Sequence, residues 1–107
     1  MQVEIYVITT EIVDIIRDNN AMSQLMDIKD EISQKCEGIT VLPMKYGEWW
    51  NSGMKCTDIG EIWRILSDNS KPIDFQWLKT KIDEIKAVTK QQSQLYTVNR
   101  NCVPYYR

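Results

Sequence analysis

The chain contains no histidine. Histidine is the side chain that most often serves as a general base near neutral pH, and it is the commonest metal ligand. Its absence excludes the Ser-His and Cys-His nucleophile pairs. The sequence also lacks the GxGxxG and GxxxxGK[ST] motifs of phosphate-binding loops. These absences predict a protein that is not an enzyme and that holds no metal or cofactor; an enzyme based on carboxylates or cysteine is the minority alternative.

Long apolar runs are also missing, because stretches such as residues 39–42 last only a few positions. Nothing in the sequence is long enough to span a bilayer, and the first twenty residues lack the basic start and apolar stretch of a signal peptide. The three cysteines, Cys36, Cys56 and Cys102, are an odd number without C-x-x-C spacing. This favours reduced thiols over a disulfide framework. We therefore expect a cytoplasmic protein with no membrane contact.

Size and composition predict one domain, residues 1–107. The chain has 107 residues, of which 43% are hydrophobic and 26% charged. A chain of this length and hydrophobic content can bury a hydrophobic core that needs no metal or disulfide to be stable. The net charge of −2 argues against nucleic acid as a partner, because nucleic-acid binders normally carry a basic surface.

The first half of the chain reads as a strand followed by two helices. Within residues 2–9, the β-branched side chains of Val3, Ile5 and Val7 occupy every second position, which is typical of a strand. Thr9 or Thr10 offers an N-cap for a first helix. The apolar stripe of that helix does not line up with the next one, so Asn19-Asn20 is the expected break. The second helix is predicted to stop at Gly38.

Beyond Gly38 the sequence predicts a brief strand, a loop and a third helix. Residues 39–42 form the strand, and Pro43 ends it. Residues 44–55 are interrupted by glycines and by Asn51-Ser52-Gly53, which is typical of a loop. Asp58 is then expected to cap a helix with a buried face of Ile59, Ile62, Trp63 and Leu66.

A fourth helix starts near Asp74 and repeats apolar side chains at helical spacing. Residues 95–98 or residues 102–106 return as a last strand. The fold class is thus a small α+β domain: a short sheet of two to four strands packed by about four helices. The side chains predicted for its core are those of Val3, Ile5, Val7, Ile15, Ile32, Ile62, Trp63, Leu78, Ile82 and Ile85.

Aromatic residues cluster in the predicted loop. Tyr46, Trp49 and Trp50 lie close together, with Lys45 and Lys55 on either side. Adjacent tryptophans in extended chain point to different sides, so one small core rarely buries both. Two interpretations stay open: the rings plug the end of the core, or at least one of them binds a partner or a planar ligand.

The charge of the chain is divided unevenly. Acidic residues dominate the first 37 positions, and Glu11, Asp14 and Asp18 would share one face of the predicted first helix. This face is either ordinary solvated surface or a surface that steers association with a positively charged protein.

Two functions follow from these features. The leading hypothesis is a non-enzymatic module that binds another protein, in the manner of an immunity protein, an antitoxin or an anti-defence inhibitor. The alternative is a small-molecule binder whose aromatic loop holds a planar, nucleotide-like ligand.

Overall fold

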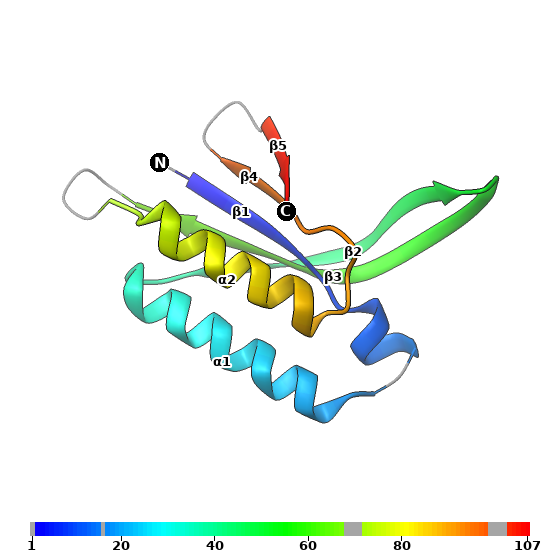
Figure 1. The fold of residues 1–107 in the computed structure, drawn as a ribbon, viewed down its shortest axis with the longest axis horizontal. Coiled ribbons are helices and arrows are strands. Elements are labelled where there is room, and N and C mark those ends of the chain that lie inside the picture. Colours follow the sequence, from blue (N-terminus) through cyan, green and yellow to red (C-terminus); the bar gives the residue numbers. More distant parts are fainter. Residues whose placement is uncertain (1, 16, 68–71, 99–102) are drawn as a thin grey trace.

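The structure is a computed structural model that describes residues 2–15, 17–67, 72–98 and 103–107. An antiparallel five-stranded sheet has the order β2-β3-β1-β4-β5. Its strands are β1 (Gln2–Ile8), β2 (Thr40–Asn51), β3 (Met54–Leu66), β4 (Leu95–Val98) and β5 (Val103–Tyr106). Two helices, α1 (Asn19–Lys35) and α2 (Phe75–Val88), lie side by side on one face of the sheet (Figure 1). A short π-helical turn, η1 (Thr10–Ile15), follows β1.

The predicted fold class is therefore wrong in its proportions. The described residues form five strands and two α-helices, where the sequence predicted two to four strands and about four helices. The predicted third helix, from Asp58, is instead part of β3. The predicted first helix is a single π-helical turn, in which the amides of Ile12 and Val13 both donate to the Thr9 carbonyl oxygen.

The prediction of a helix in place of β3 is wrong because both faces of this strand carry apolar side chains. Trp63 and Ile65 are buried beneath the helices, opposite Ile5 and Val3 of β1. Ile62 and Leu66 point to the other face, because successive side chains of a strand alternate. Together these residues imitate the spacing of an amphipathic helix.

The N-terminal strand was predicted correctly and lies at the centre of the sheet. Val3, Ile5 and Val7 are fully buried. They pack with the predicted core side chains that are also buried, namely Ile32, Trp63, Leu78, Ile82 and Ile85. Ile62 is only half-buried, and the side chain of Ile15 lies outside the described residues.

Helix α2 begins where the sequence predicted, whereas Asn19 and Asn20, the predicted break, are already the first residues of α1. Asp18 caps α1 just before Asn19, accepting a hydrogen bond from the Ala21 amide at 2.9 Å. Asp74 caps α2 in the same way through the Trp77 amide at 3.2 Å. The sequence predicted that this helix stops at Gly38, but α1 ends at Lys35. The left-handed residue after its C-cap is Glu37, with φ 62°, one position before Gly38.

Proline does not end strand β2. Pro43 lies inside it, on an edge of the sheet where its missing N–H breaks no ladder bond. The predicted loop over residues 44–55 is a hairpin instead. Ser52 and Gly53 form its two-residue turn, and both have positive φ (51° and 80°), as a type I′ turn requires.

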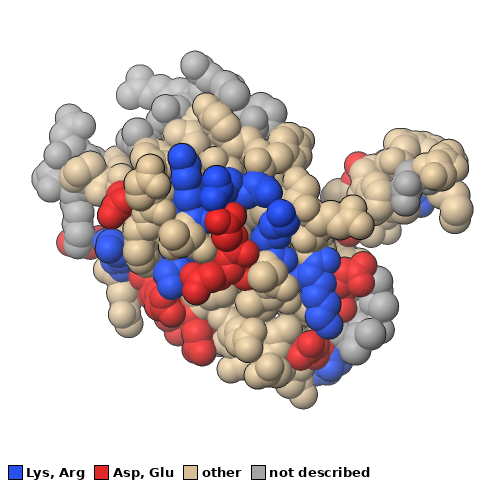
Figure 2. Space-filling model, in the orientation of Figure 1, with Lys and Arg blue, Asp and Glu red and all other residues tan. Residues whose placement is uncertain are grey.

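Both candidate C-terminal strands form. Tyr96 of β4 and Tyr105 of β5 stack with their ring centroids 5.4 Å apart. Acidic and basic side chains intermingle over the helices (Figure 2), and several are ion-paired, as Lys81 is with Glu84 at 3.0 Å. None of the helices in the described residues is long and apolar enough to cross a membrane.

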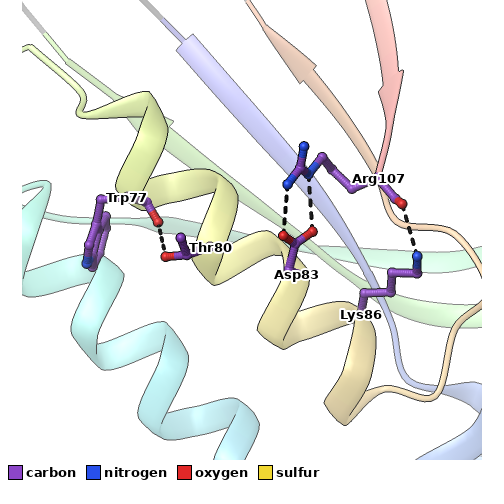
Figure 3. Close-up of polar contacts among 5 residues, drawn as sticks. All are labelled: Trp77, Thr80, Asp83, Lys86 and Arg107. Carbon is purple, nitrogen blue, oxygen red and sulfur yellow. Dashed lines mark hydrogen bonds and ion pairs between the residues drawn. The ribbon is translucent and has the colours of Figure 1, made fainter.

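A forked ion pair fastens the chain after β5 to α2 (Figure 3). Arg107 donates from Nε and a terminal nitrogen to the Asp83 carboxylate, at 3.1 and 2.8 Å. Lys86 Nζ donates to the Arg107 carbonyl oxygen at 3.0 Å, and the Arg107 amide donates to the Gln94 carbonyl oxygen at 2.9 Å. The hydrogen bonds from Arg107 hold the pKa of Asp83 below its ordinary value of 3.8.

Replacing Asp83 with asparagine should reduce the loss of stability in acid. A carboxyl whose folded pKa is lowered stabilises the fold above its unfolded pKa, and this contribution disappears as the pH falls below about 4. Thermal melts between about pH 6 and pH 2.5 should therefore show a smaller shift for Asp83→Asn than for wild type. Asp30→Asn, on the exposed side of α1, is the control. An equal shift in all three proteins would contradict the role of the pair.

Candidate functional site

The hairpin formed by β2 and β3 extends past the helices as an arm (Figure 1). We call residues 47–58 the hairpin arm. The pairing of β1 with β3 ends at Gly60, so within the described residues the strands of the arm pair only with each other. The predicted aromatic loop is therefore a projecting two-stranded ribbon.

The two tryptophans of the arm lie on opposite faces. Residues directly paired in an antiparallel ladder point to the same side. Trp49 pairs with Cys56 and Gly47 pairs with Asp58, so Trp49, Cys56 and Asp58 share one face, which we call the Trp49 face. Trp50 pairs with Lys55 on the other side. Trp49 is 46% exposed and Trp50 is 68% exposed, so the interpretation of the rings as a core plug is wrong.

The end of the Trp49 face nearest the sheet is hydrogen-bonded to the two residues that follow β1. The Thr10 hydroxyl donates to Asp58 Oδ1 at 3.0 Å and accepts from the Ile59 amide at 2.9 Å. The Thr9 amide donates to the Ile59 carbonyl oxygen at 2.8 Å. Thr10 is 9% exposed and is the first residue of η1. A carboxylate is thus held on the same face as an exposed indole.

The contribution of Thr10 and Asp58 is not predictable from the sequence. Glu61 follows Asp58 three residues later, and this spacing predicts a helix cap instead. The contact joins residues 48 positions apart, so no local pattern carried it.

The other predicted ligand residues do not gather around one site. Lys55 pairs with Glu48 at 2.9 Å on the Trp50 side of the arm. Lys45 and Tyr46 lie in β2 at the irregularity between Met44 and Gly47, and their side chains are outside what the structure describes.

The predicted acidic face is also divided. Glu11 is exposed in η1, where the backbone of Asp14 also lies, while the Asp14 side chain is outside the described part. Asp18 belongs to the start of α1, and its carboxylate is 3.4 Å from Lys90 Nζ. The hydrogen bond from the Ala21 amide, with Lys90 adding to it, lowers the pKa of Asp18. Asp18 therefore already has a structural role.

Metal-ligating side chains do not cluster in the part of the chain that the structure describes, where no group of three could hold an ion. Cys56 is a free thiol, Cys36 is half-buried, and Cys102 lies outside the described residues.

The connections define a class of fold. The order β-α-β-β-α-β with β1 and β3 central is that of a ferredoxin-like domain, here extended by β5 and the hairpin arm. This fold hosts many functions, so it does not fix one by itself.

Two solved structures share this fold along nearly the whole chain. One is a phage SAM lyase in complex with S-methyl-5'-thioadenosine, with a TM-score of 0.64 and 13% identity, covering 99% of this chain and 87% of the other. The second is a phage SAM lyase in the apo state, with a TM-score of 0.61, 12% identity, and coverage of 99% and 86%. No family model matches the sequence, and no curated protein matches it.

These likenesses correct the functional predictions. Both of these similar structures are of a lyase, which is an enzyme. The prediction of a non-enzymatic protein-binding module, of the immunity, antitoxin or anti-defence inhibitor type, is contradicted by this finding. So is the prediction that the chain is not an enzyme.

Proposed function

We propose that this protein is an enzyme that binds S-adenosylmethionine, or a closely related adenosyl sulfonium compound, and releases S-methyl-5'-thioadenosine. The observation that carries the proposal is the fold match over 99% of this chain to a lyase bound to that thioether. A small molecule was the alternative ligand class that the sequence left open, and the proposal builds on it.

The Trp49 face offers the chemistry that such a ligand needs. The adenine ring is planar and stacks on an indole. The sulfonium carries a positive charge, which is attracted to the face of an indole and to a carboxylate. Trp49 presents an exposed ring, and Asp58 on the same face is held in place by Thr10. We assign adenine stacking to Trp49 and attraction of the sulfonium to Asp58.

The reaction breaks the bond between sulfur and the amino-acid chain. The electron pair of that bond stays on sulfur, so the leaving group is a neutral thioether. The carboxylate of the substrate itself can displace it and close a lactone. This route needs no protein nucleophile and no histidine, so the protein would act by holding the substrate in the reactive geometry.

Trp49 and Trp50 provide a matched pair of variants. We expect Trp49→Ala to weaken binding of S-methyl-5'-thioadenosine about tenfold or more, because stacking on an aromatic ring contributes about 1–3 kcal/mol per base. Trp50→Ala should leave binding unchanged, since that ring lies on the opposite face. Isothermal titration measures both, and thermal melts verify that each variant is folded.

The assignment of the ligand to the Trp49 face fails if the two variants bind equally well. It also fails if Trp50→Ala has the larger effect.

A further inference from the structure

A hollow of about 350 Å³ lies at the end of β3 that is far from the hairpin arm. It is formed where α1 ends and α2 begins. Gln34 and Lys35 line it from α1, Ser67 lies just after β3, and Asp74 and Trp77 lie at the start of α2. The volume is within the range of small-molecule sites. Because it lies at the opposite end of β3, it is separate from the Trp49 face.

Trp77 gives this hollow an aromatic wall. Its side chain projects from α2 toward α1 (Figure 3), and Lys35 Nζ lies 4.7 Å from the ring centroid. A cation at this distance over an indole is weakly attracted to the ring. The indole is half-buried, so its position is set by packing while part of its surface borders the hollow.

The two lysines near Trp77 differ in how their charge is balanced. Lys81, 5.6 Å from the same ring, is paired with both Glu31 and Glu84, and these hydrogen bonds raise its pKa. Lys35 has no carboxylate partner among the described residues. The carboxylate of Asp74 is engaged in capping α2 through the Trp77 amide. The hollow is thus lined by an indole, that of Trp77, and by the ammonium group of Lys35, which forms no ion pair with a carboxylate of the described residues.

We infer that this hollow is a second ligand site, for a small molecule that carries a planar ring and one anionic group, such as a nucleoside monophosphate. The ring would stack on Trp77, and Lys35 would leave the indole to pair with the anion. The flexible four-carbon stem of lysine permits that movement. The inference does not depend on the proposed function, because the two sites share no residue.

Titrations of adenosine monophosphate, adenosine and inorganic phosphate test the site. They are run in a Trp49→Ala background, so that stacking on the arm does not contribute. We expect saturable binding of adenosine monophosphate, weaker binding of adenosine and no saturable binding of phosphate. Adding Lys35→Gln should weaken binding of adenosine monophosphate about tenfold, close to the affinity for adenosine, because a hydrogen bond to a charged group is lost. Trp77→Phe should weaken both ligands.

Lys29→Gln, in α1 but outside the hollow, is the matched control and should bind as the background protein does. Thermal melts verify folding of each variant. Full affinity for adenosine monophosphate in folded Lys35→Gln would overturn the inference. So would the absence of saturable binding to the unmodified hollow, or equal binding of phosphate alone.

Discussion

Replacing Gly60 with alanine is expected to destabilise the protein by about 3 kcal/mol or more. A Cβ atom at this position would collide with the carbonyl oxygen of Val7 and lie 3.0 Å from Ile8 Cα. Both are backbone atoms of the central strand, so no side-chain rotation relieves the contact. The sheet would have to separate β1 from β3 at the point where the hairpin arm begins.

Gly47→Ala is the control for this prediction. Gly47 also lies in a strand, yet a Cβ there meets nothing within 4 Å. We expect a change within about 0.5 kcal/mol, as for other surface substitutions. Urea unfolding of the two variants beside wild type gives the comparison. A Gly60→Ala variant as stable as Gly47→Ala would mean that β1 and β3 are not as close as described.

Truncation of Trp63 to alanine should cost about 3–5 kcal/mol of unfolding free energy, the range measured for large aromatic side chains in cores. Trp63 is 1% exposed and lies in β3 opposite Ile5. Its Nε1 donates to Glu61 Oε1 at 3.3 Å, so the variant loses a hydrogen bond as well as apolar contact. The cavity would lie at the centre of the core.

Trp50→Ala removes the same side chain from an exposed position and is the internal control. Its ring is 68% exposed, and we expect a change within about 0.5 kcal/mol. Denaturant melts that gave similar losses for Trp50→Ala and Trp63→Ala would contradict the described burial.

The elements that the sequence predicted well are those with one buried face. β1 alternates cleanly because Val3, Ile5 and Val7 meet the helices. α2 repeats Leu78, Ile82 and Ile85 against the same core, and Asp74 marks its start. When one face of an element is buried and the other is exposed to solvent, the hydrophobic periodicity and the capping residues predict that element directly.

The hairpin arm could not be found by periodicity. Neither of its faces packs on the core, so Trp49, Trp50 and Met54 are all exposed and no alternation of apolar and polar residues results. The remaining local signal was Ser52-Gly53, a turn pair that fits a two-residue hairpin. This signal predicts a hairpin only if its two strands are allowed to have no buried face.

The candidate site was predicted only in part. The exposure of an arm tryptophan was one of two interpretations that the sequence left open, and the structure places both rings in solvent. The link from Thr10 to Asp58 is a long-range contact, invisible to local patterns. The absence of histidine does not exclude an enzyme, because the proposed cleavage of a substrate by its own carboxylate needs positioning more than acid–base catalysis.

Incubation of the purified protein with S-adenosylmethionine, followed by chromatographic detection of S-methyl-5'-thioadenosine, tests the central claim most directly. We expect the thioether to accumulate faster than in a protein-free blank. Trp50→Ala should retain this rate, whereas Trp49→Ala should lose most of it at substrate concentrations below saturation. Accumulation no faster than the blank, with protein shown to be folded, would contradict the proposed function.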